Sequence, residues 1–384
     1  MDKQRRSKTL FLAVTFLFWI TLYLYVPTLP IYVKMKTVDL STVGLVLSMY
    51  GLCMAFVRLP MGILGDLVGR GNTLIMSGIF LAAAGAVLMG RGNTIFTLAA
   101  GRALTGLSAG TWVILIAVFS TFFDADKAIF ASSMLTFSAN FGRMVSTAST
   151  GFLNRVGGYR LSFYIAGICG IVALLLVLFV REEKRPPMNV SLRSVAQLFL
   201  RRDLLLPTVM SIVVHYSDWA VTFGFLPILA QQMGMGEVAR SLLISLNIGG
   251  ITIANLINTL MLRRLKHGIL LFSGALLFFS GIIIIALSPS PAYLFVGTVC
   301  MGYAFGMVYP ILIGMSIQNI DRSQRSTAMG IHQSLYAIGM FTGPWLSGTI
   351  ADHLGIRPVF LMTAGIYILL MLLFLGLLSR KAAG

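Results

Sequence analysis

The sequence predicts an all-α membrane protein with twelve transmembrane helices in two pseudo-symmetric six-helix bundles. Three observations lead to this prediction: the chain is poor in charge, its apolar residues form runs of membrane length, and its two halves repeat each other. Of the 384 residues, 57% are apolar and 11% are charged, whereas a soluble domain has roughly 25% charged residues. A surface so poor in charge must mostly face lipid.

The apolar runs have the length that a membrane requires. Runs such as 165–180 with its flanks and 269–287 contain about twenty residues, enough to cross roughly 30 Å of hydrocarbon. The expected spans are 9–33, 42–65, 73–91, 94–120, 127–153, 159–181, 205–232, 239–262, 268–287, 291–317, 325–349 and 356–379.

The basic residues predict the orientation. The net charge of +17 does not indicate nucleic-acid binding, because Lys and Arg are spread over the short gaps between spans. Such residues mark cytoplasmic loops. Twelve spans put both termini on one side of the membrane. If that side is the cytoplasm, most of the basic residues that lie between spans are cytoplasmic. We expect a multi-pass protein of a bacterial or archaeal inner membrane with cytoplasmic termini.

The remaining composition predicts no cofactor chemistry. A full-length apolar span follows the basic N-terminus, so we expect no cleaved leader. Cys53, Cys169 and Cys300 lie singly within apolar runs, which favours packing over disulfides or metal binding. We expect a monomer without metal or cofactor. Its expected partners are a small-molecule substrate, protons and membrane lipids.

A polar stretch divides the chain. Residues 181–203 form the longest polar segment, and Pro186-Pro187 with mixed charges is typical of a linker. Residues 191–200 suit a short amphipathic helix at the membrane surface. The sequence therefore predicts an N-terminal six-helix bundle over 1–181, a cytoplasmic linker over 182–204 and a C-terminal six-helix bundle over 205–384.

The two halves carry the same series of glycines. Those of the fourth span recur in the tenth, 196 residues later, and further matches follow with one residue inserted. Duplicated halves with a substrate site between them are a transporter architecture. The matches are Gly101/Gly297, Gly106/Gly302, Gly110/Gly306, Asp124/Asp321, Gly142/Gly339, Gly151/Gly348, Gly158/Gly355, Arg160/Arg357 and Phe163/Phe360.

A loop after the second span has the chemistry of a gate. It contains Gly62, Gly65, Asp66, Gly69 and Arg70, and from Gly62 to Arg70 it follows a Gly-x-x-x-Asp-x-x-Gly-Arg pattern. Gly62 and Gly65 allow close helix approach, Gly69 allows a tight turn, and Asp66 can accept hydrogen bonds from a helix N-terminus. The loop closely resembles the signature loop of the major facilitator superfamily, which implies a gating role. The alternative is a polar turn without that role.

Buried arginines form the second group of candidates. Arg102 precedes Gly106 and Gly110 in the fourth span, about 12 Å below the outer surface. This segment resembles the second motif of the same superfamily, where the arginine is associated with proton coupling; a structural contact to carbonyls is the alternative. Arg58 and Arg143 also lie within spans. Arg58 is a candidate for the substrate cavity, with binding of backbone carbonyls or lipid phosphate as the alternative. Arg143, with Arg102, could form a positive patch for a carboxylate or phosphate on the substrate, with structural ion pairing as the alternative.

Asp218 is the acid that lies within a span. It is about 20 Å from the inner end of the seventh span, and His215 precedes it by one turn. A buried carboxylate that water reaches from alternating sides can take up and release a proton, as proton-coupled transport requires. A permanent pair with Arg102 or Arg143, or binding of a cationic substrate, are the alternatives. His215 and His332 are also candidates, although lone histidines often only pack.

Two further sets complete the candidate site. Gly343-Pro344 in the eleventh span resembles a motif that proton-driven drug exporters carry in the fifth, and it could act as a bending point. Its absence from the fifth span weakens the assignment to exporters. The aromatic residues that could line a cavity are Trp19, Tyr23, Trp112 and Trp219, with Tyr25 and Tyr216 also considered.

The resemblance to the major facilitator superfamily covers nearly the whole chain. It implies a proton-coupled antiporter that exports a small organic molecule by alternating access. Uptake or exchange of an organic anion bound by the buried arginines is the alternative. The spans hold no paired carboxylates, histidine cluster or catalytic triad, so an enzyme is not expected. A receptor or scaffold with this fold is disfavoured by the two intact motifs.

Overall fold

The protein is an all-α bundle, as predicted. A computed structural model describes residues 2–68, 71–124, 127–180, 192–261, 266–321 and 324–383, and these contain helices and turns but no strand. The helices are α1 (Asp2–Tyr23), α2 (Leu29–Lys34), α3 (Leu40–Val68), α4 (Gly71–Arg91), α5 (Ile95–Ala109), α6 (Trp112–Ser120), α7 (Ala128–Gly157), α8 (Tyr159–Val177), α9 (Leu192–Leu198), α10 (Arg202–Ala220), the π-helix η2 (Val221–Phe225), α11 (Leu226–Gln232), α12 (Glu237–Met261), α13 (His267–Ala286), α14 (Pro291–Ile317), α15 (Arg325–Leu354) and α16 (Ile356–Ala383).

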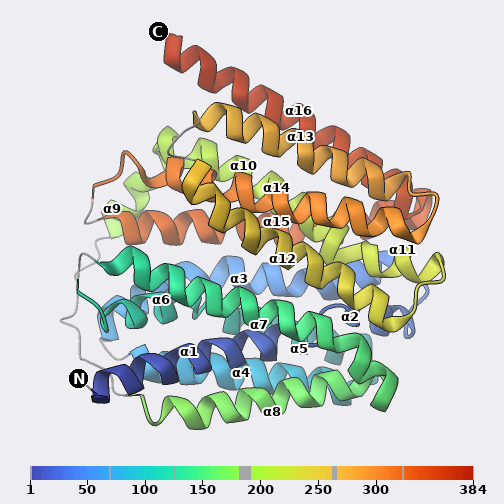
Figure 1. The fold of residues 1–384 in the computed structure, drawn as a ribbon, viewed down its shortest axis with the longest axis horizontal. Coiled ribbons are helices and arrows are strands. Elements are labelled where there is room, and N and C mark those ends of the chain that lie inside the picture. Colours follow the sequence, from blue (N-terminus) through green and yellow to red (C-terminus); the bar gives the residue numbers. More distant parts are fainter. Residues whose placement is uncertain are drawn as a thin grey trace.

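The helices run side by side in two groups. In Figure 1 the blue to green helices α1–α8 occupy one half of the molecule, and the yellow to red helices α10–α16 occupy the other. Both chain termini lie at the same end of the bundle, here named the termini end; the opposite end, with α2 and α11, is the far end. The short α9 falls within the expected amphipathic segment 191–200. The predicted linker is otherwise largely outside the described residues.

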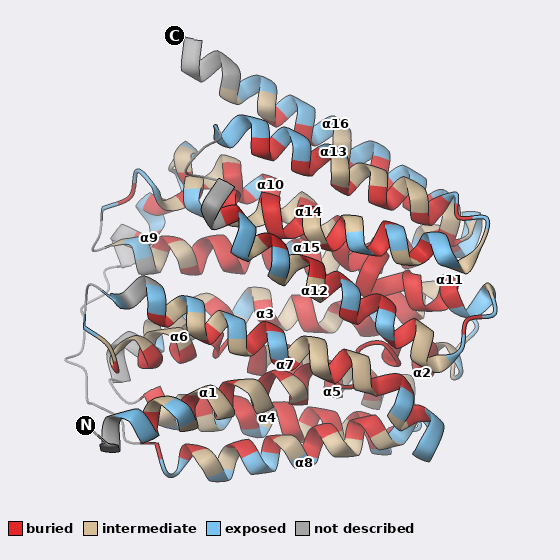
Figure 2. Cartoon of the chain, in the orientation of Figure 1, coloured by how far each residue is buried: buried red, intermediate tan, exposed pale blue. Residues whose placement is uncertain are grey.

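The outer faces of the bundle are suited to lipid. Leu175 and Leu178 near the end of α8 and Leu369 and Leu373 in α16 are more than half exposed. Figure 2 shows exposed residues along the outer helices and buried ones between the helices. Exposed leucines in such numbers would cost free energy in water. This pattern supports a membrane protein.

Nine helical stretches in the described part of the chain are long and apolar enough to cross a membrane. The predicted spans 9–33, 127–153 and 325–349 are not among them. They correspond to α1 with α2, to α7 and to α15, which carry more polar residues such as Arg143 and Gln333. At 30 residues each, α7 and α15 are about 45 Å long, and Figure 1 places them along the other helices.

Three spans expected as single helices are interrupted. The first breaks into α1 and α2 around Pro27, which has no backbone N–H to continue a helix. The fourth breaks at Gly110 and Thr111, between α5 and α6. The seventh continues from α10 through the π-helix η2 into α11, three residues after Asp218. Breaks of these kinds often mark functional regions of a helix.

The repeated glycines make the same contacts in both halves. A β-carbon at Gly101 would lie 2.7 Å from the carbonyl oxygen of Gly85, and one at Gly297 would lie 2.7 Å from that of Gly281. Either distance is too short for a real side chain. Glycine therefore lets α5 approach α4, and α14 approach α13, in the same way.

Helices α3 and α15 form a tight seam between the two groups. Gly44 of α3 packs on the carbonyl of Pro344, and Gly51 packs on the backbone of Met340 and Phe341. The seam continues toward the termini end, where the backbone N–H of Leu59 donates to the hydroxyl of Ser334. Helices α7 and α12 form the second contact between the groups, on another face of the bundle.

Candidate functional site

A cavity of about 320 Å³ lies between the two groups of helices. Residues of both groups form its wall, which combines aromatic, amide and charged side chains. The lining residues that the sequence had singled out are Trp19, Tyr23, Arg58, Trp112, Arg143, His215, Asp218 and Trp219. The structure thus brings together eight of the ten residues proposed for proton coupling and for the substrate cavity; Arg102 and His332 lie outside this lining set.

Asp218 supplies a buried carboxylate to the cavity wall. It is 2% exposed, and its Oδ1 accepts a 2.9 Å hydrogen bond from the hydroxyl of Thr222. The side chain of Asn247 lies beside it. Asp218 makes no ion pair with any described residue. The alternative of a permanent pair with Arg102 or Arg143 is therefore absent from this conformation.

Two arginines of the cavity wall contact aromatic side chains. The guanidinium carbon of Arg143 lies 3.5 Å from the ring centroid of Trp19 and 5.0 Å from that of Tyr23. Arg58, which is 3% exposed, donates a 2.6 Å hydrogen bond to the hydroxyl of Tyr336 across the α3–α15 seam. Stacking holds a guanidinium in place while leaving donors for other groups.

Arg102 lies behind the wall. Its guanidinium carbon is 4.3 Å from the ring centroid of Tyr50 and 5.8 Å from that of Trp219. Its Nε and one terminal nitrogen make no hydrogen bond with the described residues. Trp219 follows Asp218 directly in α10, so Arg102 contacts the neighbour of the carboxylate and not the carboxylate itself.

The two histidines differ in position. His215 lies in the cavity wall, where its Nδ1 is 2.8 Å from the carbonyl oxygen of Ser211 and its ring stacks on Tyr336 at 4.0 Å. His332 is fully buried, and its Nδ1 is 2.8 Å from the hydroxyl of Thr208. The ring of His332 packs against Tyr336 at 6.0 Å and Tyr309 at 6.3 Å, and both of these tyrosines line the cavity.

Aromatic pairs join the two groups of helices at the side of the cavity toward the far end. Tyr50 of α3 stacks on Trp219 of α10 with ring centroids 5.3 Å apart and planes at 15°. Tyr23 of α1 meets Phe223 of η2 edge-on at 6.2 Å. All four rings line the cavity, so these pairs form its wall on that side.

A carboxylate of α15 caps α3 at the far end. Asp352 accepts hydrogen bonds from the backbone N–H of Leu40 at 2.6 Å and of Ser41 at 3.0 Å. These are donors in the first turn of α3, which no residue of the helix itself can satisfy. The cap joins the two groups. It also places a negative charge at the positive end of the α3 helix dipole, which stabilises the helix.

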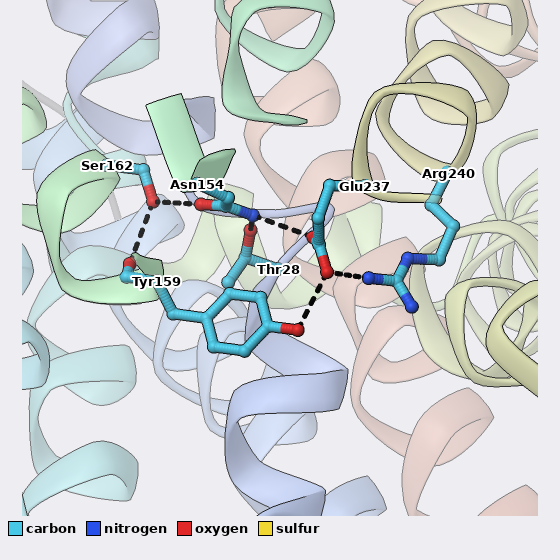
Figure 3. Close-up of polar contacts among 6 residues, drawn as sticks. All are labelled: Thr28, Asn154, Tyr159, Ser162, Glu237 and Arg240. Atoms are coloured by element: carbon cyan, nitrogen blue, oxygen red, sulfur yellow. Dashed lines mark hydrogen bonds and ion pairs between the residues drawn. The ribbon is translucent and has the colours of Figure 1, made fainter. Parts of the chain in front are cut away.

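A second network joins α12 to the first group (Figure 3). Glu237 forms an ion pair with Arg240, and its carboxylate accepts hydrogen bonds from Tyr159 at 2.7 Å and from Asn154 at 3.1 Å. Asn154 also donates to the hydroxyl of Thr28 at 2.7 Å. Glu237 begins α12 and Asn154 is near the end of α7, so this network closes the second contact at the far end.

The predicted gating residues fall in different surroundings. At Gly62 the atom nearest to a β-carbon would be 3.8 Å away, an ordinary contact, so the expected close helix approach does not occur there. Gly69 and Arg70 lie outside the described residues. Gly65 and Asp66 belong to α3, but their surroundings are not described. Gly343 and Pro344 are inside the continuous helix α15; Gly343 packs on the backbone of α10 and Pro344 on α3.

Sequence reasoning missed several residues of the wall. Tyr336, Tyr309 and Gln333 line the cavity beside His215 and Arg58. The acids Glu237 and Asp352 lie just outside the expected spans, so their positions in the sequence did not indicate a role. Gln333 could have been found from sequence, because a polar side chain within an apolar span is costly in lipid without a partner or a cavity. Tyr336 and Tyr309 carried no comparable signal of a cavity.

The bundle and its internal cavity define a class: an α-helical membrane transporter with its candidate site between two groups of helices. The chain belongs to the Major Facilitator Superfamily, whose family model matches residues 11–213 and 208–384. It is a transporter and not an enzyme.

Relatives and solved structures agree with this assignment. The chain is 26% identical over 317 residues to the multidrug resistance protein MdtG of Escherichia coli K12, covering 79% of this chain and 76% of that protein. The fold is similar to that of the nucleoside transporter NupG, with a TM-score of 0.82 at 15% identity over 96% of this chain and 99% of that one. The human organic anion transporter MFSD10 gives a TM-score of 0.72 at 15% identity over 97% and 99%.

Proposed function

We propose that this protein is a proton-coupled antiporter that exports a small organic molecule across the cytoplasmic membrane by alternating access. The proposal includes twelve spans, with α1, α7 and α15 counted, and both termini in the cytoplasm. It also takes 1–181 and 205–384 as the two moving bundles, joined by the linker. The similarity to a protein named for multidrug resistance favours export.

One observation carries the proposal: the wall of the cavity holds a buried carboxylate, that of Asp218, without an ion-pair partner. An unpaired carboxylate in a desolvated site strongly favours its neutral form, and hydration or a nearby cation favours the charged form. Opening of the cavity to alternating sides would therefore change its proton occupancy. The hydroxyl of Thr222 is placed to donate to the ionised form.

The contacts between the bundles support alternating access. The Asp352 cap and the Glu237 network join them at the far end. Both are hydrogen-bonded contacts at helix ends that can break as units without unfolding a helix. When they break, the cavity would open toward the far side. A proton from that side would then bind Asp218 as substrate leaves.

A second candidate is uptake or exchange of an organic anion. Arg58 and Arg143 line the cavity against one aspartate, so its wall has an excess of positive charge. Stacked guanidinium groups suit carboxylates and phosphates. The similar structure of a human organic anion transporter is compatible with this reading.

Transport in proteoliposomes tests the two candidates. Wild-type protein would be reconstituted with imposed proton gradients of either direction, and flux followed for size-matched lipophilic cations and organic anions. We expect transport opposite to proton flow. Flux along the proton gradient for anions would favour the second candidate. Flux that is indifferent to the gradient would reject proton coupling.

Arg143 supplies the matched variants for this assay. Arg143→Gln removes the charge, whereas Arg143→Lys keeps the charge and removes the planar stacking on Trp19. An anion requirement predicts that glutamine abolishes flux and lysine restores part of it. Cation export predicts that flux persists in Arg143→Gln.

A further inference from the structure

The two contacts between the bundles are not equally closed. The seam of α3 and α15 is packed along its length, from Gly44 at the far half to Leu59 and Ser334 toward the termini end. The close contacts of α7 with α12 lie elsewhere. Gly151 packs on the backbone of Glu237, and the hydroxyl of Ser245 donates to the carbonyl of Met144 at 2.9 Å. These contacts are at the far end and in the middle.

A groove occupies the remaining part of the α7–α12 face. It has a volume of about 400 Å³ and is lined by α7, α12 and α14. Figure 1 shows α7 and α12 close at the far end and diverging toward the termini end. Thr136, Asn140 and Tyr309 line both this groove and the central cavity. The groove is therefore continuous with the cavity wall.

The polarity of the groove changes from its rim to its interior. At the rim, Phe137 is 52% exposed and Leu256 is 61% exposed on the lipid-facing side. Deeper in, Asn140 is 7% exposed and joins the cavity wall. A molecule with an apolar body and a polar head would match this order, with its head toward the amide and its body against the phenyl ring.

We propose that this groove is a lateral portal through which an amphipathic substrate enters the cavity from the lipid leaflet on the termini side. This inference rests on the proposed transport function and adds the source and class of the substrate. The occupant is the transported molecule itself, dissolved in the bilayer. Entry from lipid uses its partitioning into the membrane to raise its concentration at the portal, so an apolar substrate need not be captured from dilute aqueous solution.

The internal repeat supplies a matched test. Thr136 of α7 corresponds to Gln333 of α15 in the repeat, and both line the central cavity. Thr136 borders the groove, whereas Gln333 is on the closed seam. Single cysteines, Thr136→Cys and Gln333→Cys, would be made after Cys53→Ser, Cys169→Ser and Cys300→Ser. Ser132→Cys and Met329→Cys form a second matched pair, in case one variant fails to fold.

The assay compares a bilayer-confined maleimide with a water-soluble one in proteoliposomes. We expect the bilayer-confined reagent to modify Thr136→Cys about tenfold faster than Gln333→Cys, because a closed face exposes its side chains only during local opening. The water-soluble reagent should not reproduce this difference. Equal rates with the bilayer-confined reagent in both pairs, or no modification of the α7 cysteines, would overturn the portal.

Protection by a probe tests the occupant. Tetraphenylphosphonium and tetraphenylborate are similar in size and opposite in charge, and both enter lipid. We expect one of them to slow modification of Thr136→Cys by at least about threefold, whereas tetramethylammonium, which stays in water, should not. Protection by neither would overturn an amphipathic substrate as the occupant. Labelling needs no transport, so the portal can stand or fall separately from proton-coupled export.

Discussion

Arg102 is held by aromatic rings and not by the carboxylate of Asp218. Its depth in the membrane could be predicted from sequence, because depth follows from position along a span. Its partner could not, because the rotation of α5 against α3 and α10 depends on glycine contacts such as Gly106 on Tyr50. The ring of Tyr50, 4.3 Å away, is the nearest aromatic support of its charge.

Removing that ring tests the support. Tyr50→Leu should lower the free energy of unfolding by at least about 1–2 kcal/mol, the magnitude of a desolvated cation–π contact. The reduced Tm would be measured by tryptophan fluorescence on heating in detergent. Tyr50→Phe keeps the ring and should remain near wild type. An equal loss in both variants would show that the hydroxyl, and not the ring, supports the structure.

Asp218 was found from sequence because it is an acid within an apolar span. Its surroundings were only partly foreseen. Trp219 follows Asp218 directly in the chain, and Thr222, whose hydroxyl donates to the carboxylate, lies one turn further on. The side chain of Asn247 comes from α12, and a sequence without the fold does not bring that helix to Asp218.

At the scale of elements, the Asp352 cap joins α15 to the start of α3. Asp352→Asn leaves one carbonyl oxygen for two backbone donors and should weaken the closed far end by about 1 kcal/mol, or roughly fivefold in population. Spin labels at the exposed positions Val38 and Leu354 would report the shift as a longer distance between the two helix ends.

The adjacent Asp39 is the control for this prediction. It is exposed, one residue before α3, and Asp39→Asn makes the same chemical change beside the capped end of α3. Its distance distribution should match that of wild type. A distribution unchanged in Asp352→Asn as well would mean that the cap does not contribute to closure of the far end.

The α3–α15 seam depends on glycine. A β-carbon at Gly51 would lie 2.9 Å from Cβ of Met340 and closer still to the backbone of Phe341. Gly51→Ala should therefore lower the free energy of unfolding by about 1–3 kcal/mol through overpacking. Gly365→Ala, at a site with no neighbouring atom within 4 Å, should not lower it. Thermal melts of both variants make the comparison, and equal Tm values would contradict a closed seam.

Helix positions were predictable to a useful degree, but their breaks were not. Runs of apolar residues fix where a chain can cross the membrane. The interruptions at Gly110 and at η2 depend on packing around the cavity. The break near Pro27 had a local cause that the expected span 9–33 ignored, because an apolar run was taken as one helix.

At the scale of the molecule, the sequence repeat predicted two similar halves but not the difference between their contacts. Glycines recur at matched positions and make matched approaches, as at Gly101 and Gly297. The α3–α15 and α7–α12 faces nevertheless differ, since Gln333 lies on the packed seam whereas its counterpart Thr136 borders the groove. Relative closure of the faces is a property of both bundles together, so neither half alone predicts it.

The most direct test of proton coupling is Asp218→Asn in proteoliposomes, with the probe that the wild-type protein transports best. Gradient-driven accumulation and counterflow exchange would be measured in the same vesicles, and Asp124→Asn, at an exposed loop position, would serve as control. The account predicts that Asp218→Asn loses accumulation and keeps exchange, because the carboxylate is needed only for the proton. Accumulation at the wild-type level in Asp218→Asn would contradict the account.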